Sequence, residues 1–329
     1  HNVFLYNMYT VCYRVYHHFC NMSIVFDSFF YVFLLKNDCF PLGKCFVFTR
    51  ENPYSRMQVY IFNNLEVFMD NKKKGMNPIL PGFYPDPSIC RVNDDYYLVT
   101  STFAYFPGVP IFHSRDLVHW NQIGNILERK EQLPLVNAET SEGIFAPTLR
   151  YHDGTFYMIT TNVTPTNDIN NFIVTATDPA GPWSDPYPLD SAGIDPSLFF
   201  DDDGKCYYCG TQNRREGSRY FGGNEIYIQE LDLNTMKLVG ESYPAWHGAL
   251  RGVEWPEGPH IYKKDGYYYL LISEAGTGHN HAVSIARSKS LTEPFTGHKA
   301  NPIFTHRHLG YHYPCLLYTS PSPRDTERS

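Results

Sequence analysis

The sequence predicts an all-β fold of the propeller type, and three observations support this prediction. Aromatic residues make up 16% of the 329 residues, and 23 glycines and 24 prolines interrupt the chain, which favours short strands joined by sharp turns. A proline-containing motif recurs four times at intervals of about 50–60 residues, a period typical of propeller blades. The same order of strands and turns follows each copy. A β-sandwich would explain alternating strands but not this repeated order.

Each repeat unit is expected to contain four strands. The motifs occupy residues 84–88, 145–148, 194–197 and 257–260, and a short first strand follows each one. Second strands are predicted at residues 96–99, 156–159, 207–209 and 267–271, and third strands at 110–113, 172–175, 225–228 and 282–285. A fourth, outer segment is expected near Trp120, Trp183 and Phe295. Four such units make four blades around a central channel.

Turn dipeptides separate the first and second strands of every unit. They are Asn93-Asp94, Asp153-Gly154, Asp203-Gly204 and Asp265-Gly266. Asp-Gly between two strands is a strong hairpin signal, because glycine tolerates the positive φ that a type I′ turn requires. These dipeptides therefore fix where each predicted hairpin reverses.

The chain divides into three segments of different composition. Residues 1–75 show no steady period of 2 or 3.6 and are interpreted as a leader translated from upstream sequence, with a membrane-associated leader as the competing interpretation. Residues 76–310 carry the repeats and form the expected propeller. Residues 311–329 are polar, contain several prolines and resemble an adapter-like disordered tail.

Charge and cysteine content exclude several classes of function. The net charge of −7 gives no reason to expect nucleic-acid binding, and no segment is suited to crossing a membrane. We expect a cytoplasmic location, because no signal peptide is readable. Cys206 and Cys209 have metal-like spacing, but residues three apart on a strand point to opposite faces, so buried thiols are expected. No oligomeric state is indicated.

Three of the four motifs carry a carboxylate at nearly the same place. These residues are Asp86, Asp195 and Glu257, and the second motif has none. Equivalent positions in propeller blades meet around the axis, so the three side chains are expected to converge. An aspartate before a proline is often only a turn residue, but three together predict an acid–base active site. Glu254 is the rival candidate for the acid.

Five stretches, taken in order, resemble family 43 glycoside hydrolases, in particular the β-xylosidase and α-L-arabinofuranosidase branch. They are residues 77–88, 101–110, 114–120, 193–199 and 256–262. The resemblance implies a five-bladed β-propeller, of which about four blades are present here, often followed by a β-sandwich. It also implies an inverting exo-glycosidase that removes terminal xylose or arabinose from xylan and related cell-wall oligosaccharides.

The resemblance assigns a role to each carboxylate. It makes Asp86 the general base, Asp195 the group that tunes and orients the acid, and Glu257 the general acid. Such chemistry needs one ionised carboxylate to deprotonate water and one protonated carboxyl to donate to the leaving oxygen, roughly 6.5–9.5 Å apart. A third carboxylate raises the pKa of the acid by like-charge repulsion.

The resemblance also suggests groups around the substrate. Phe103 is expected to wall the terminal sugar, and Phe145 could stack in the same way; the alternative for both is ordinary blade packing. His260 is a candidate supporting hydrogen-bond residue. His279 and His281 lie in a loop that could rim the pocket, but they are more often solvated loop residues than a metal site.

The chain departs from the family pattern after its fourth repeat. The fifth blade, its axial histidine that helps to hold a calcium ion, a later sugar-binding arginine and the β-sandwich are not found in the sequence. The chemistry requires no cofactor. Open blade edges promote aggregation, so we expect this polypeptide to be weakly active or inactive. The alternative function is a carbohydrate-binding propeller without catalysis.

Overall fold

A computed structural model describes two compact units, residues 1–74 and 75–329. Within them, the structure describes the strands at 24–27, 30–33, 45–49 and 58–62, and residues 78–165, 170–218, 220–249, 254–305 and 307. The expected tail at 311–329 lies outside the described residues. Within the described part of the chain, no helix is long and apolar enough to cross a membrane.

The first unit contains a small antiparallel sheet in the order β1-β2-β3-β4. Its strands are β1 (Ile24–Asp27), β2 (Phe30–Phe33), β3 (Cys45–Thr49) and β4 (Gln58–Phe62). The sequence pattern of this region, which lacks a steady period of 2, did not predict these strands.

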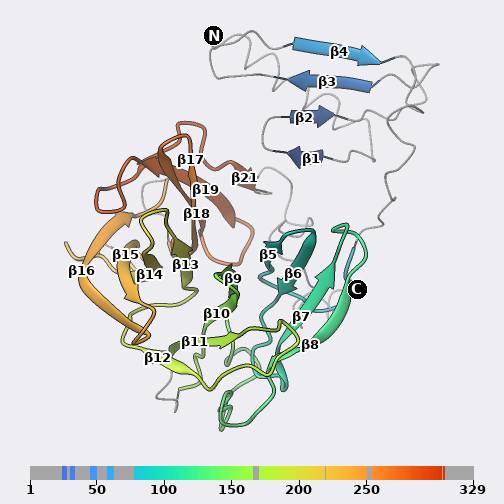
Figure 1. The fold of residues 1–329 in the computed structure, drawn as a ribbon. Helices are drawn as coiled ribbons and strands as arrows, with labels where there is room; N and C mark the ends of the chain where they lie inside the picture. Colours follow the sequence, from blue (N-terminus) through green and yellow to red (C-terminus); the bar gives the residue numbers. More distant parts are fainter. Residues whose placement is uncertain are drawn as a thin grey trace. The chain divides into compact units, whose positions relative to one another are not determined.

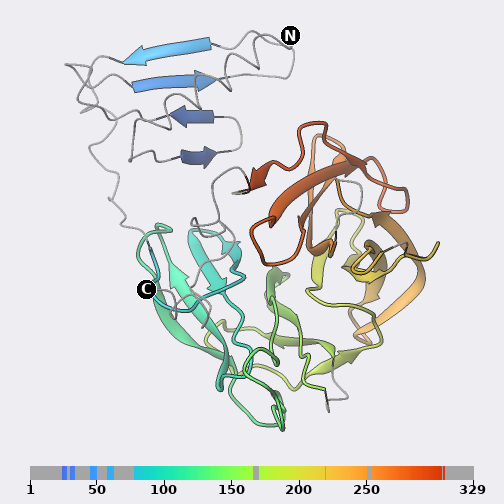
Figure 2. The same ribbon diagram turned by 180° about the vertical axis from the view of Figure 1, so that it is seen from behind.

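The second unit contains four sheets, and each is one repeat of the sequence (Figures 1 and 2). The first sheet contains β5 (Ser88–Val92), β6 (Asp95–Val99), β7 (Gly108–Ser114) and β8 (Asn121–Leu127). The second contains β9 (Thr148–His152), β10 (Thr155–Thr161), β11 (Asn171–Ala176) and β12 (Tyr187–Leu189).

The remaining two sheets repeat this pattern. The third contains β13 (Ser197–Phe200), β14 (Cys206–Asn213), β15 (Asn224–Asp232) and β16 (Lys237–Trp246). The fourth contains β17 (Glu257–Lys264), β18 (Tyr267–Glu274), β19 (Ala282–Ser288) and β20 (Thr296–Gly297). An additional strand, β21 (Phe304–Thr305), pairs with β19. The predicted blades and their strand order are confirmed, and the outer strands begin just after Trp120 and Phe295 and a few residues after Trp183.

The first strand of each blade is the innermost one. Strand β9 contacts β5 on one side and β13 on the other, and β13 contacts β17. Among the described residues, β17 and β5 lack a comparable contact. The four sheets therefore follow one another around a shared axis, as Figure 1 shows from β5 to β17.

The predicted hairpin turns lie where the sequence indicated. Two-residue loops join β5 to β6, β9 to β10 and β17 to β18, because residue 92 pairs with 95, 152 with 155, and 264 with 267. Asp153, Gly154, Asp265 and Gly266 all have positive φ, as a type I′ turn requires. The third hairpin is longer, since Phe200 pairs with Cys206.

Apolar side chains fill the space between neighbouring blades. One core joins Val99 and Ile111 of the first blade to Leu149 and Phe156 of the second, and two further cores join the second to the third and the third to the fourth. Cys206 and Cys209 belong to different cores, so the expectation of buried thiols on opposite faces is confirmed.

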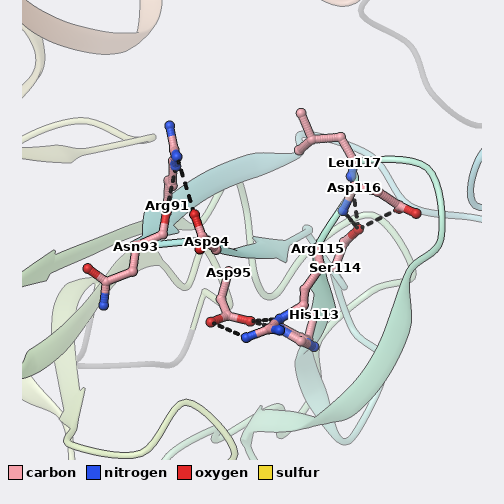
Figure 3. A network of polar contacts seen from close by, with 9 residues as sticks. All are labelled: Arg91, Asn93, Asp94, Asp95, His113, Ser114, Arg115, Asp116 and Leu117. Carbon is pink, nitrogen blue, oxygen red and sulfur yellow. Dashed lines mark hydrogen bonds and ion pairs between the residues drawn. The ribbon is translucent and has the colours of Figure 1, made fainter. Parts of the chain in front are cut away.

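Residues 114–120, one of the five stretches that resemble the family, form the turn between β7 and β8. The Ser114 hydroxyl accepts the backbone N–H of Asp116 at 3.1 Å and of Leu117 at 3.0 Å. Figure 3 shows this turn beside Asp95, whose carboxylate lies 2.7 Å from His113 Nε2 and accepts a bond from Arg115 Nε at 3.0 Å. This stretch therefore has a structural role in joining β7 to β8.

Candidate active site

The three predicted carboxylates lie at the same end of their blades. Asp86 and Asp195 each stand two residues before an inner strand, and both have positive φ, 53° and 54°. Glu257 is the first residue of β17, where a β-bulge follows: Glu257 pairs with Ser273, but His260 pairs with Leu271. The bulge absorbs the extra residue that separates Glu257 from its proline, so all three side chains start at equivalent places.

A hydroxyl residue faces the carboxylate position in every blade. Glu257 pairs with Ser273, and continuing the registers of the other blades sets Ser101, Thr161 and Thr211 at the equivalent position. The Ser101 hydroxyl donates to Asp86 Oδ2 at 2.6 Å. In the next blade, the Thr161 hydroxyl accepts the backbone N–H of Asp195 at 3.1 Å. These hydroxyls fix the segments that carry the carboxylates.

The carboxyls are close enough to change one another's ionisation. Burial raises the pKa of Glu257 to about 7, and the charge of Asp86 adds to the effect. Burial raises the pKa of Asp195 well above its usual range, and repulsion from Glu257 and Asp86 raises it further. Asp195 Oδ1 is buried without a hydrogen-bond partner, which disfavours its charge. Asp195 and Glu257 therefore titrate as a pair that retains a proton near neutral pH.

Asp86 has a different environment. It remains accessible to solvent, but the surrounding protein atoms limit its hydration and raise its pKa. The hydrogen bond from Ser101 and the nearby charge of His281 both favour the ionised form. Asp86 is thus the carboxyl whose contacts favour the charge that a base requires.

An aromatic group borders the segment that carries Asp86. The rings of Phe103 and Phe145 lie with centroids 5.7 Å apart at 71°. The ring centroid of Phe83, three residues before Asp86, also lies 5.7 Å from that of Phe103. Phe103 and Phe145 are half-buried, so each ring keeps a surface that a ligand can contact. Phe83 was not singled out from the sequence.

His260 faces a half-buried arginine. Nη2 of Arg150, on β9, lies 2.8 Å from His260 Nδ1. Burial, helped by the charge of Arg150, lowers the pKa of His260 to about 3. His260 is therefore neutral, and its Nδ1 is occupied by the guanidinium.

His281 reaches Asp86 from the fourth blade. Its side chain is buried, so the expectation that this histidine is a solvated loop residue is wrong. Its Nδ1 contacts the carbonyl oxygen of Gly276, and its own carbonyl accepts the Thr305 hydroxyl at 2.9 Å. Burial lowers the pKa of His281, while the charge of Asp86 acts in the opposite direction. The loop between β18 and β19 thus rims the site.

The hydroxyl residues that face the carboxylate positions were not singled out from the sequence, although they form a weak repeat. These residues lie within two residues of the end of the second strand in each blade, a repeat visible only once the four units are aligned by register; they are Ser101, Thr161, Thr211 and Ser273. Arg150 gave no signal, because its partner lies 110 residues away in sequence.

The calcium ion that the resemblance allows remains a prediction. The described residues contain no group of three His, Cys, Asp or Glu side chains that could hold a metal ion. No step of the chemistry considered below is routed through a metal.

Fold and site together define the class: a β-propeller with three coupled carboxyls at the axial end of its inner strands. The chain belongs to family 43 of the glycosyl hydrolases, whose family model matches residues 76–315. Family members of known structure are five-bladed propellers.

Curated relatives support this assignment. A xylosidase/arabinosidase of Butyrivibrio fibrisolvens is 66% identical over 241 residues, covering 72% of this chain and 46% of that protein. A non-reducing end α-L-arabinofuranosidase of Bacteroides ovatus is 46% identical over 246 residues, 73% of this chain and 44% of that protein. The chain therefore spans less than half the length of these relatives.

A solved structure shows the same fold. The xylan β-1,4-xylosidase of Bacillus halodurans superimposes with a TM-score of 0.66 at 47% identity, over 72% of this chain and 45% of that one. The family model begins at residue 76, and the interpretation of residues 1–75 as a translated leader stays a prediction.

Proposed function

We propose that this chain carries the catalytic propeller of an inverting exo-glycosidase that removes terminal xylose or arabinose from plant cell-wall oligosaccharides. The observation that carries the proposal is the placement of Asp86, Asp195 and Glu257 at equivalent ends of three inner strands. The raised pKa of Glu257, about 7, agrees with this placement. A carboxyl that keeps its proton near neutral pH suits protonation of a leaving oxygen, whereas a sugar-binding module has no use for it. The names of the relatives support the substrate class.

In the proposed mechanism, hydrolysis occurs in one step. Glu257 gives its proton to the glycosidic oxygen as the bond to the anomeric carbon breaks. A water molecule attacks that carbon from the opposite face and passes one proton to Asp86. The hydrogen bond from Ser101 holds the Asp86 carboxylate in one orientation. Burial and repulsion from Glu257 raise the pKa of Asp195, so these two carboxyls titrate together. After the products leave, Asp86 releases its proton to solvent and Glu257 takes one up, which restores the starting state.

The aromatic group supplies the wall of the sugar subsite. Phe103 and Phe145, with Phe83 beside them, present apolar surface next to Asp86, which suits the carbon-rich face of a pentose. Because Arg150 occupies Nδ1 of His260, only Nε2 of that ring is left to bind a sugar hydroxyl.

The test uses the 329-residue chain as given by its sequence. We expect slow release of p-nitrophenol from p-nitrophenyl β-D-xyloside or α-L-arabinofuranoside, with α-xylose as the first product from the β-xyloside, detected by proton NMR. Glu257→Gln should reduce turnover at least about 100-fold, the typical contribution of a positioned acid. Glu254→Gln is the matched control and should retain turnover.

Two outcomes would contradict the proposal. β-Xylose as the first product would exclude inversion. Failure of the chain both to hydrolyse these glycosides and to bind xylose, while circular dichroism shows it folded, would exclude a glycosidase function for this polypeptide.

A further inference from the structure

Trp255 is clamped beside Glu257 by two loops of the active-site face. Its backbone N–H donates to the carbonyl oxygen of Gly222, in the loop between β14 and β15, at 2.7 Å. On the other side, the N–H of Ala275, in the loop between β18 and β19, donates to the carbonyl of Glu254 at 2.8 Å. Since Trp255 precedes Glu257 by two residues, these bonds fix the segment that ends in the proposed acid.

The indole ring packs against bare backbone on both sides. A Cβ atom added to Gly222 would lie 2.8 Å from the indole Nε1, and one added to Gly276 would lie 2.9 Å from Cε3. Both distances are too short for a real contact, so each loop approaches the ring only because it has glycine there. The glycines also have positive φ, 73° and 62°. The position of the Trp255 ring is therefore held by two separate loops.

Phe221 extends this aromatic surface into solvent. Its ring centroid lies 5.6 Å from that of Trp255, with the ring planes at 88°. Phe221 is 82% exposed, the largest exposure among the large apolar side chains of the described residues. An exposed phenylalanine forgoes the burial that normally stabilises it, and here it stands on a fixed support next to the acid.

The place of this pair relative to Glu257 indicates what it would contact. An acid that protonates the glycosidic oxygen has the departing sugar on its own side of the scissile bond. The aromatic residues Phe83, Phe103 and Phe145 lie instead beside Asp86, on a different blade. The molecule thus has two separate aromatic surfaces, one near the base and one near the acid.

We propose that Phe221 and Trp255 form the subsite that binds the sugar on the leaving-group side of the bond. The inference rests on the proposed function and deepens it, because it makes the preferred substrate a disaccharide or longer chain rather than an aryl glycoside. A pentose in a β-1,4-linked chain presents C–H groups that pack against aromatic rings.

Sugar binding to a variant with strongly reduced turnover tests the subsite. In the Glu257→Gln background, the Kd for xylose and for xylobiose would be measured by calorimetry, with and without Phe221→Ala. We expect Phe221→Ala to weaken xylobiose binding about three- to tenfold, as loss of one aromatic contact typically does, and to leave xylose binding unchanged. Tyr187→Ala, an exposed aromatic on β12 of the second blade, is the control and should change neither.

Each other outcome has a distinct meaning. If xylose and xylobiose bind but Phe221→Ala weakens neither, or weakens both equally, the subsite is disproved while the proposed function stands. If neither sugar binds to the folded Glu257→Gln chain, the proposed function fails and the subsite fails with it. A change in the Trp255 emission with xylobiose but not with xylose, absent in Trp255→Phe, would independently support the subsite.

Discussion

Nη2 of Arg150 lies 2.8 Å from Nδ1 of His260, and this contact joins the inner strands of the second and fourth blades. Nε of the same guanidinium donates to the carbonyl of Leu198, on the third blade, at 3.0 Å. A guanidinium can only donate, so Nδ1 accepts and the ring proton is assigned to Nε2. One half-buried side chain, that of Arg150, therefore ties three inner strands together.

This contact makes stability dependent on pH through His260. The pKa of His260 is about 3 in the folded chain, against an ordinary value of 6.5, so the unfolded chain binds more protons between these limits. Stability should therefore fall as pH falls below 6.5, by up to about 1.4 kcal/mol per pH unit from this residue. Urea melts at pH 7 and 5 would measure it, and His260→Gln should remove that part of the loss. An equal loss in the variant would show that His260 is not the cause.

Local signals explain how much of the fold was predictable. Asp153-Gly154 and Asp265-Gly266 determine two-residue hairpins through the φ angles of their own residues, so the sequence alone reveals them. The convergence of Asp86, Asp195 and Glu257 followed from repetition, because equivalent blades place equivalent residues around one axis. Both signals are readable without knowledge of distant contacts.

The rest of the site depends on contacts between blades. Arg150 and His260 are 110 residues apart, and no pattern in either strand marks the partner. The sequence indicates a solvated His281, because its burial depends on contacts with Gly276 and Thr305 that no local pattern marks. Phe221 carried no signal at all, since its support is a tryptophan from the next blade.

Asp195 should limit stability at neutral pH. Its folded-state pKa is raised well above the ordinary 3.8, so the folded chain binds more protons than the unfolded chain and loses stability as pH rises above that value. Asp195→Asn removes a buried charge whose Oδ1 has no partner, and should stabilise the chain by about 1–3 kcal/mol at pH 7.5.

Thermal melts would show this as a rise of roughly 2–9 °C in Tm for a unit of this size. At pH 4, where the native carboxyl keeps its proton, the gain should largely disappear. A gain of equal size at both pH values would mean that the charge of Asp195 is not responsible.

His281 should set the acid limb of the pH–activity profile through Asp86. The charge of His281 lowers the pKa of Asp86, so His281→Asn should raise that pKa and move the acid limb to higher pH. The other groups around the pair are Asp195 and Glu257 near Asp86, and Arg307 near His281. The measurement is kcat/KM on the aryl xyloside at pH 5 relative to pH 7.

His279→Asn, in the same loop, is the control for that experiment. The ratio of activities should fall in His281→Asn and stay constant in His279→Asn. A fall in kcat/KM by the same factor at both pH values would indicate that His281 only supports the loop.

Substitution of two glycines in one loop would distinguish the effect of backbone strain from the effect of the contact with Trp255. Gly217 and Gly222 both have positive φ, 82° and 73°, so alanine is strained at either position. A Cβ at Gly217 would meet nothing within 4 Å, whereas at Gly222 it would lie 2.8 Å from the Trp255 indole. Gly222→Ala should therefore destabilise the chain by about 1–3 kcal/mol more than Gly217→Ala, the usual cost of overpacking. The clash displaces Trp255, which adjoins the proposed acid. Turnover should therefore also fall in Gly222→Ala but not in Gly217→Ala. Equal urea midpoints and equal turnover in the two variants would show that the indole does not hold Glu257 in place.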